Sequence, residues 1–493
     1  MTKSLLLAHD LGTSGNKATL YRLDGKLVDS VVYPYEATVL RNGWAQQNPE
    51  DWWRAVCAGT RHLMKGRASE DIAGISFGGQ MMGCVCIDAE GRLLMDSIIW
   101  SDMRATGENR ILEERFGFAH ACTVTGLRPA PNYTLQKLMW IKANMPDIYE
   151  RTWKALQAKD YMVYRMTGEA GTDVTDAAMT QALDINRLAW SGEIIEAAGI
   201  RPGIFPDLKK SASVAGGLRK EAAEEMGLIA GTPVITGAGD GLCATVGAGS
   251  VEPGVGHCCL GSSSWVSNCT LKKIDNADGV LMYNPHVVDD MYCLTGTMQA
   301  GGLSYKWAAE NFYPGESYPA LDGIAADAGA GANGVMFLPY LMGERAPWWD
   351  AQATGAFLGL GLHTSKEDLL RAVLEGVALN LALIFREIHK IEPVREINVI
   401  GGGAKGGIWP QMLADLFHVP VYKLASAESG TSFGAAVIAG VALGVYSDYT
   451  VAEELIEREE AFEPDEARHA LYAEKLLAFE QAYLALKPVF GKL

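Results

Sequence analysis

Short apolar runs alternate with longer amphipathic stretches along the chain, and this alternation predicts an α/β fold. In the first half we expect strands at Leu5–His9, Ala18–Arg22, Leu27–Tyr33, Gly74–Phe77, Gly83–Asp88 and Pro233–Thr236. The helices expected there are Pro49–Lys65, with Asn48 as its cap, Leu135–Asn144 and Lys159–Met166.

The second half repeats this plan. Its predicted strands are Gly256–Leu260, Ser264–Thr270, Met291–Thr295 and Ile397–Ile400. Its predicted helices are Gly301–Glu310, Ser365–Lys390, Gly407–Phe417 and Gly430–Leu443, and Glu453–Leu486 is expected to form a charged helical tail. The repeated order of elements indicates two related α/β units.

Each half contains one strand–turn–strand unit near its start. The turn Asp10–Gly15 separates two apolar runs, and so does the turn Leu260–Ser264. Gly12 and Gly261 are 249 positions apart (261 minus 12) in a chain of 493 residues. Small, hydroxyl-bearing residues let backbone N–H groups approach a phosphate closely. Two such turns suit a polyphosphate held between two domains, although each alone is also common in a plain hairpin.

Proline and glycine interrupt the pattern between Ser250 and Gly254, and we place the domain boundary there. Just before it, an apolar strand leads into an acidic glycine turn and then into an Ala- and Gly-rich helix. The predicted domains are residues 1–249 and 250–493, and each is long enough to bury its own core.

The charge balance argues against a protein that binds nucleic acid or an anionic membrane. The net charge is −17, from 42 Lys and Arg against 59 Asp and Glu, so no surplus of cations exists to bind nucleic acid or an anionic membrane. The longest apolar stretch, Phe433–Tyr446, is too short to span a bilayer and predicts a buried helix. No signal peptide is recognised at the start of the sequence. These features predict a cytoplasmic protein.

The cysteines favour buried thiols over a metal site. Cys84 and Cys86 alternate within a predicted strand, which places both side chains on one face. No second pair at metal-ligand spacing accompanies them, so a zinc site is disfavoured.

Two further glycine-rich segments follow apolar strands. In Gly237–Gly241 the acid Asp240 stands at a sharp strand-to-helix turn, where it is either an accessible base or a cap of the next helix. Gly401–Gly407 holds five glycines in seven residues where a strand leads into a helix. This suits close approach of a flat or anionic ligand, with a flexible turn as the alternative. The segment is neither a Gly-x-Gly-x-x-Gly pattern with a ribose-binding acid about 20 residues further on nor a P-loop that ends in Gly-Lys-Ser/Thr.

Together these features resemble the FGGY family of carbohydrate kinases, from Leu5 to about Tyr446. The most specific stretch, Gly355–Glu375, fits the family's second signature, and Lys137-Leu-Met-Trp140 is similar to the core of the first. The segments that look most like the xylulokinase (pentulose kinase) branch are Gly43–Gln47, Tyr340–Pro347 and Pro410–Asp415. The family belongs to the superfamily of sugar kinases, hsp70 and actin. The resemblance therefore implies two duplicated ribonuclease H-like domains with an interdomain cleft.

The resemblance implies an ATP-dependent phosphotransferase that uses Mg2+. Asp240 is then the general base that takes the proton of the sugar hydroxyl, and Asp10 holds the metal together with Asp240. The ATP-binding residues implied in the first domain are Gly12, Thr13, Ser14 and Lys17. Those implied in the second domain are Gly261, Ser262, Ser263, Gly301, Tyr305, Gly403 and Gly407.

The substrate is a sugar or polyol by the same resemblance. The residues implied to bind it are Gln80, Met81, Met82, Trp100, Asp102 and Asn132, together with Asp240. Met82 stands where xylulokinases usually carry His, and Gly241 stands where they carry Asn. We expect D-xylulose to be converted to D-xylulose 5-phosphate. Ribulose, glycerol, erythritol and gluconate stay open as alternatives, and the acidic Asp102 argues against a sugar acid.

A different class of protein also stays open. An hsp70- or actin-like ATPase shares the phosphate turns and the adenosine glycines. It does not need the segment from Gln80 to Asp102 or the FGGY signature. Analogy with relatives suggests a homodimer, and no other partner is implied beyond the small-molecule substrate.

Overall fold

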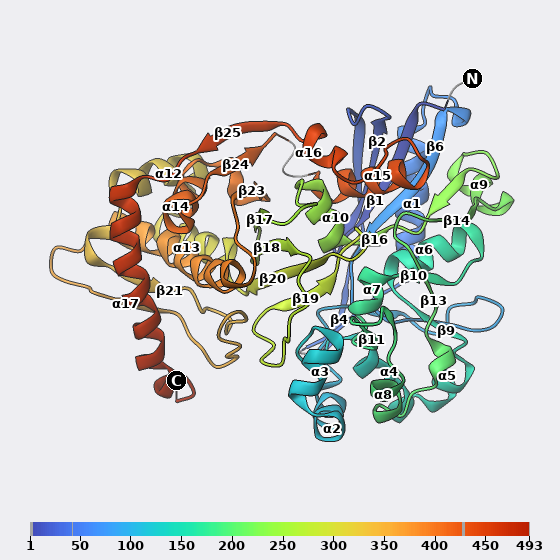
Figure 1. Cartoon of the computed structure of the whole chain (residues 1–493), viewed down its shortest axis with the longest axis horizontal. Helices are drawn as coiled ribbons and strands as arrows, with labels where there is room; N and C mark the ends of the chain where they lie inside the picture. Colours follow the sequence, from blue (N-terminus) through green and yellow to red (C-terminus); the bar gives the residue numbers. More distant parts are fainter. Residues whose placement is uncertain (1–2, 42, 426–428, 493) are drawn as a thin grey trace.

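Figure 1 shows the computed structural model of the chain, which describes residues 3–41, 43–425 and 429–492. Two mixed sheets flanked by helices lie side by side, one built from each half of the chain (Figure 1). The alternation of apolar runs predicts this α/β architecture, which is confirmed.

The elements of the first half are as follows. The strands are β1 (Leu5–Leu11), β2 (Gly15–Arg22), β3 (Leu27–Pro34), β4 (Thr38–Arg41), β5 (Trp44–Gln47), β6 (Ile72–Gly79), β7 (Val85–Ile87), β8 (Ser97–Ile98), β9 (Lys154–Leu156), β10 (Gly171–Asp173), β11 (Leu183–Asp184), β12 (Ala189–Trp190), β13 (Asp207–Lys209), β14 (Val214–Gly217), β15 (Pro233–Ile235) and β16 (Ala238–Gly239). The helices are α1 (Pro49–Leu63), α2 (Thr106–Phe116), α3 (Phe118–Thr125), α4 (Thr134–Asn144), α5 (Pro146–Arg151), α6 (Ala158–Thr167), α7 (Val174–Ala178), α8 (Gly192–Ala197), α9 (Lys220–Met226) and α10 (Asp240–Gly247).

The second half is built in the same manner. Its strands are β17 (Val255–Leu260), β18 (Ser264–Thr270), β19 (Met282–Pro285), β20 (Tyr292–Met298), β21 (Met336–Leu338), β22 (Ala356–Leu358), β23 (Glu396–Ile400), β24 (Val421–Leu424) and β25 (Arg458–Phe462). Its helices are α11 (Gly302–Phe312), α12 (Tyr318–Asp327), α13 (Lys366–Ile391), α14 (Ile408–Phe417), α15 (Gly430–Ala442), α16 (Val451–Leu455) and α17 (Glu466–Phe490).

The two sheets share one topology. The first contains the strand order β3-β2-β1-β6-β15, and the second contains the order β20-β18-β17-β23-β24. In each, a three-stranded antiparallel meander is extended by two parallel strands. The two strand–turn–strand units of the sequence are β1–β2 and β17–β18, so they occupy equivalent places in a duplicated scaffold.

Side-chain caps determine where the two long amphipathic helices begin. Asn48 accepts a hydrogen bond from Glu50 N at 2.9 Å at the start of α1, which confirms the predicted cap. At the start of α13, Ser365 Oγ accepts from Asp368 N at 3.2 Å, and Asp368 Oδ2 accepts from Ser365 N at 2.9 Å. This reciprocal pair satisfies two N–H groups that a helix start leaves open.

The C-terminal tail is not helical throughout, contrary to its prediction. Arg458–Phe462 forms β25, which pairs antiparallel with β24, and α17 begins only at Glu466. Without β25, β24 would be the open edge of the second sheet. Pairing satisfies the backbone N–H and C=O groups of that edge, which outweighs the helical preference of the charged sequence.

Helix α15 comes from the second half of the chain but packs on the first sheet, beside α10 (Figure 1). The two helices approach closely because glycines face the contact. A Cβ added to Gly247 would overlap the Gly430 carbonyl oxygen, and one added to Gly434 would overlap the Cys243 carbonyl oxygen. The apolar stretch predicted to be buried therefore joins the two halves of the molecule.

The cysteines are buried and free in the part of the chain that the structure describes. The sulfurs of Cys84 and Cys86 lie 3.9 Å apart, so both thiols share one face of their segment, as the alternation predicts. Within the described residues, every helix is either too short or too polar to cross a bilayer.

Candidate active site

The carboxylates of Asp10 and Asp240 are carried by the carboxyl ends of two strands that flank β6. Asp10 pairs with Gly78 on one side of β6, and Ala238 pairs with the same Gly78 on the other side. Asp240 follows two residues later as the first residue of α10. Both acids predicted from the sequence to act in the site therefore lie at the carboxyl ends of neighbouring strands in the first sheet.

Their surroundings disfavour negative charge. Burial raises the pKa of Asp10 to about 6, although the charge of Lys17 acts in the opposite direction. Burial, followed by the charge of Asp10, raises the pKa of Asp240 to about 7. A hydrogen bond from Gly241 N to Asp240 Oδ1 at 2.7 Å offsets part of this shift. Two adjacent carboxyl groups with raised pKa values bind a proton or a cation more readily than ordinary Asp side chains do.

The same pair has the chemistry of a magnesium site. Mg2+ prefers carboxylate oxygens and retains several waters, so one or two carboxylates suffice beside a phosphate. The raised pKa values of Asp10 and Asp240 mean that their negative charges lack full compensation within the protein. A divalent cation would provide that compensation, so both residues fit the metal-binding role that the resemblance implies.

The raised pKa of Asp240 predicts that Asp240→Asn stabilises the fold at alkaline pH. The folded pKa of about 7 lies above the ordinary 3.8, so the folded protein loses stability as pH rises from the lower value through the higher one. The variant should gain roughly 1–3 kcal/mol in unfolding free energy at pH 8 and almost nothing at pH 4. Urea unfolding of the metal-free protein at both pH values measures this difference. An equal gain at both values would contradict the assigned pKa.

Hydrogen bonds from distant segments hold the β1–β2 turn. Gly12 N donates to Gly15 O at 3.1 Å, and Tyr35 OH donates to Gly12 O at 2.5 Å. Gln47 Nε2 donates to Thr13 O at 2.6 Å. These bonds engage the carbonyl groups of the turn and fix its backbone.

Ser14 and Lys17 complete the set predicted for phosphate in the first domain. Ser14 is exposed at the tip of the turn. Lys17 lies opposite Asp10 in the β1–β2 ladder, and its Nζ donates to Ser429 Oγ at 2.9 Å at the start of α15. Lys17 thus links the first sheet to the helix that comes from the second half.

Residues predicted to bind substrate contact this same turn. Trp100 Nε1 donates to Thr13 Oγ1 at 2.8 Å. Gln80 Nε2 donates to Gln47 Oε1 at 2.8 Å and to Gly12 O at 3.3 Å. The Oε1 atom of Gln80 is buried and accepts no hydrogen bond from the residues described. Gln47 therefore joins the two predicted sites, a role that the sequence signalled only through the family-like segment Gly43–Gln47.

Met81, Met82 and Asn132 come together next to the segment that leads into Asp240. A Cβ added to Gly239 would overlap Met81 Cε. Met82 has a left-handed φ of 64°, and its Sδ lies 3.4 Å from Asn132 Nδ2. The structure thus brings these three predicted substrate residues into one group.

Asp102 is enclosed within the first half. Its side chain is 0% exposed. It accepts hydrogen bonds from Ala45 N at 2.6 Å, Arg104 Nε at 2.9 Å and Arg104 NH2 at 2.7 Å. The Arg104 guanidinium also lies 4.2 Å from the centre of a Trp44 ring. Its direct contact with substrate stays a prediction, and in this structure its charge is neutralised by Arg104.

The β17–β18 turn borders a pocket of about 730 Å³ formed by the second half. The carbonyl of Gly261 accepts a hydrogen bond from Gly302 N at 2.8 Å, and that of Ser262 accepts from Leu303 N at 3.1 Å. The turn therefore packs directly against the start of α11. The N–H groups at the start of α11 are therefore engaged by carbonyl groups, that of Ser304 by Gly301 O at 3.0 Å, and they hold the turn against the pocket.

Aromatic rings and a carboxylate line the rest of the pocket. Tyr305 and Trp409 meet edge to face with ring centres 5.4 Å apart, and Tyr305 OH donates to Asp322 Oδ1 at 2.7 Å. A Cβ on Gly403 would lie 2.8 Å from the Trp409 ring, so glycine keeps this wall flat. The predicted nucleotide residues that line the pocket are Gly261, Ser262, Tyr305 and Gly403, whereas Ser263, Gly301 and Gly407 adjoin lining residues in the chain. Sequence reasoning missed Asp322, for which no motif gives a signal.

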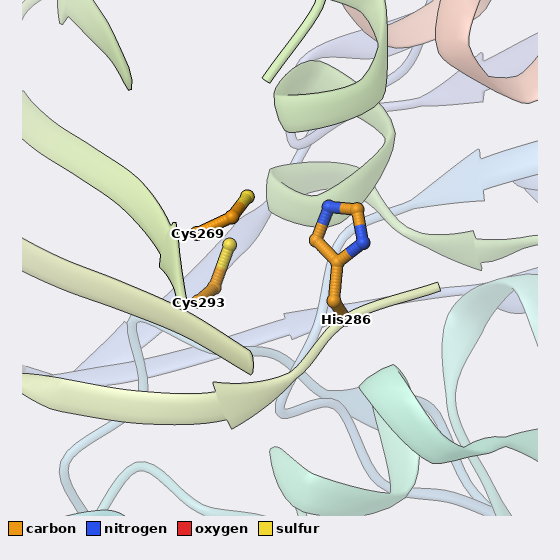
Figure 2. Close-up of side chains that lie close together, drawn as sticks. All are labelled: Cys269, His286 and Cys293. Atoms are coloured by element: carbon orange, nitrogen blue, oxygen red, sulfur yellow. The ribbon is translucent and has the colours of Figure 1, made fainter. Parts of the chain in front are cut away.

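Figure 2 shows Cys269, His286 and Cys293, whose ligand atoms lie within 4.8 Å of one another in the buried part of the second half. His286 Nδ1 accepts a hydrogen bond from Val288 N at 3.1 Å, so the neutral ring carries its proton on Nε2. A metal-bound His instead donates its second N–H to an acceptor. Burial lowers the pKa of His286 to about 4, which keeps the ring neutral. This arrangement fits packed thiols beside a neutral imidazole better than a metal centre.

Two domain models of one family match most of this chain. The model for the N-terminal domain of the FGGY family of carbohydrate kinases matches residues 5–247, and the model for its C-terminal domain matches residues 256–443. A xylulose kinase of Bacillus subtilis (strain 168) is 34% identical over 462 residues, which cover 92% of each chain.

Solved structures agree with these matches. The ligand-bound xylulose kinase from Lactobacillus acidophilus superposes with a TM-score of 0.94 at 27% identity over 100% of both chains. The gluconate kinase from Lactobacillus acidophilus superposes with a TM-score of 0.93 at 28% identity over 99% of both chains. A xylulose kinase and a gluconate kinase thus superpose on this chain with nearly equal TM-scores.

Proposed function

The chain belongs to the FGGY family of carbohydrate kinases, and from this premise we propose that it transfers the terminal phosphoryl group of ATP to D-xylulose, forming D-xylulose 5-phosphate. The pair of carboxylates formed by Asp10 and Asp240 carries the proposal. Phosphoryl transfer to an alcohol needs a group that orients the hydroxyl and compensation for phosphate charge. Similarity to xylulose kinases over most of the chain supports the choice of sugar.

Asp240 acts as the general base in this proposal. Its pKa of about 7 makes it a better proton acceptor than an ordinary Asp and still leaves much of it ionised at neutral pH. In a loose transition state the hydroxyl proton moves late, so Asp240 first orients the sugar oxygen and then accepts its proton. Asp10 and Asp240 would hold Mg2+, which when bound offsets the charge of the phosphates.

We assign the phosphates to the two turns and the adenosine to the 730 Å³ pocket. The first half contributes Gly12, Thr13, Ser14 and Lys17, and the second half contributes Gly261, Ser262, Ser263, Gly301, Tyr305, Gly403 and Gly407. The equivalent positions of the turns in the two sheets support this assignment, as does the place of Gly261 and Ser262 in the lining of the pocket.

The sugar is assigned to the group around Gln80, Met81, Met82, Trp100 and Asn132. The unpaired Gln80 Oε1 is an acceptor for a sugar hydroxyl, and leaving it unpaired would cost free energy. Asp102 contributes by holding the segment that follows Trp100, through its bonds to Arg104 and Ala45 N.

A sugar acid such as gluconate is the second candidate substrate. The charge of Asp102, which argued against a sugar acid, is paired with Arg104 and buried. Arg345 donates no side-chain hydrogen bond to the residues that the structure describes, and its charge acts on the pKa of Tyr133, next to Asn132. A guanidinium that donates no hydrogen bond to the described residues still has its N–H groups available for the carboxylate of a sugar acid, although the charge of Glu344 also acts on it.

An ADP-release screen with MgATP tests the proposal. D-xylulose, D-ribulose, glycerol, erythritol and gluconate are supplied one at a time, and nuclear magnetic resonance locates the new phosphate ester. We expect D-xylulose to give the highest kcat/KM, with the phosphate on the C5 hydroxyl. A higher kcat/KM for gluconate would favour the second candidate. ADP release that none of the five compounds accelerates would contradict both candidates and leave another sugar or polyol as the substrate.

The proposal also covers the domain boundaries, the oligomeric state and the cellular compartment of the protein. Residues 1–249 form the domain with the sugar site, the first phosphate turn and the base, and residues 250–493 form the domain with the second turn and the adenosine site. The family matches end at residue 247 and resume at residue 256, which supports this division. We propose a cytoplasmic homodimer by analogy, and light scattering of the purified protein measures its mass.

A further inference from the structure

A buried ammonium group surrounded by three carboxylates lies close to the segment that leads into Asp240. Lys159 Nζ on α6 lies 2.6 Å from Asp160 Oδ1, 3.0 Å from Asp173 Oδ1 and 3.1 Å from Asp176 Oδ2. These four side chains are at most 1% exposed. Desolvation makes buried ion pairs a weak source of stability. What the cluster holds in place explains it better than a gain in stability.

Asp173 determines the orientation of the Thr175 hydroxyl. Asp173 Oδ2 accepts hydrogen bonds from Thr175 Oγ1 at 2.7 Å and from Ser211 Oγ at 2.7 Å. A hydroxyl has one proton, so this bond leaves only the lone pairs of Thr175 Oγ1 for a further partner. Gly239 N donates to that oxygen at 3.0 Å. The cluster is thus connected, through one hydroxyl, to the residue before Asp240.

The segment held by this bond has little freedom to move. Gly239 pairs with Gly79 of β6, where an added Cβ would lie 2.8 Å from Lys159 Cβ. Gly237, two residues earlier, requires a φ of +74°. Because Asp240 follows Gly239 directly, any displacement of the Gly239 N–H also moves the Asp240 carboxylate.

We propose that Thr175 is a positioning residue for phosphoryl transfer, which holds the Gly239 N–H and thereby the Asp240 carboxylate in register with the sugar oxygen. Asp173 and Lys159 support it by fixing the direction of its hydroxyl. This inference rests on the proposed function and deepens it. Thr175 acts through Asp240, and misplacement of a reacting group by about 1 Å costs on the order of 10²-fold in rate.

Three variants test the inference. Thr175→Val removes the hydroxyl at nearly constant volume, and Thr175→Ser keeps it. We expect Thr175→Val to lower kcat with the best sugar about 10- to 100-fold, with KM values for ATP and sugar changed less than about three-fold. Thr175→Ser should restore kcat. Thr167→Val is the matched control, because the buried Thr167 hydroxyl likewise accepts from a backbone N–H, that of Glu169 at 3.1 Å, and kcat should stay near that of the wild type.

Hydrogen exchange of the Gly239 amide adds a readout that needs no sugar. Mass spectrometry of a peptide covering residues 235–245 should show faster exchange in Thr175→Val than in the wild type or Thr175→Ser. A kcat of Thr175→Val within about three-fold of the wild type, or unchanged exchange, would overturn the inference. If no sugar accelerates ADP release by the wild type, the proposed function fails. The exchange rates still decide whether Thr175 holds Gly239.

Discussion

Replacement of Asp240 by Asn is expected to lower kcat for sugar-dependent ADP release by about 10²- to 10⁴-fold. The Asn side chain has nearly the same shape and still offers an oxygen to Gly241 N, but it cannot take the hydroxyl proton. It also removes one of the two negative groups proposed to hold the metal. Steady-state kinetics at saturating Mg2+, with D-xylulose and ATP varied in turn, measure the loss.

Asp51→Asn is the matched control for this substitution. Asp51 lies in the first turn of α1 as Asp240 lies in that of α10, but it is paired with Arg54 at the surface. The kcat of the Asp51→Asn variant should stay within about two-fold of the wild type. The stability gain predicted for Asp240→Asn at pH 8 separates lost chemistry from a lost fold. A folded variant with near-normal turnover would remove Asp240 from the reaction.

Asp10→Asn is expected to lower kcat/KM by about 10²- to 10³-fold and to raise the Mg2+ concentration needed for half-maximal rate. The physical reason is the loss of a carboxylate oxygen at the site of phosphate charge. Rates measured as a function of Mg2+ concentration test this. Asp29→Asn, at the exposed strand β3 beside Arg67, is the control and should leave the Mg2+ dependence unchanged.

The same Asp10→Asn variant should also shift the pH profile. The charge of Asp10 raises the pKa of Asp240, so its removal lowers that pKa. In the wild type, kcat/KM should fall as pH drops through about 7, where Asp240 gains a proton. In the variant this fall should move to lower pH, only in part because burial is the larger cause. An unmoved profile together with an unchanged Mg2+ dependence would contradict the proposed pairing.

Elements that depend on neighbouring residues could be predicted from the sequence. The alternation of apolar residues located the strands on both sides of the Asp10–Gly15 turn and of the Leu260–Ser264 turn. Asn48 marked the start of α1 because a cap acts on N–H groups only two residues away. The two turns lie about half the chain length apart, which indicated a duplicated scaffold, and the strand orders confirm it.

Elements that depend on distant segments could not be predicted. Arg458–Phe462 has a charged pattern typical of a helix, and it becomes a strand because β24 presents an open edge. Gln47 joins the phosphate turn to Gln80, 33 residues further along the chain. The sequence shows that Asp102 is an acid, but not whether its carboxylate can contact a ligand. Its oxygens accept hydrogen bonds from Ala45 N, 57 residues earlier, and from Arg104, two residues later.

The sequence by itself determined the family, the two turns and the two acids, because these are matters of residue type and spacing. Only the tertiary structure decided that Asp10 and Asp240 flank one strand, that Asp102 is neutralised, and that Thr175 holds the residue before Asp240. The physical reason is that a pKa and a hydrogen bond depend on burial and on distances of a few ångströms. Chain positions far apart reach such distances only when the sheets and helices have packed.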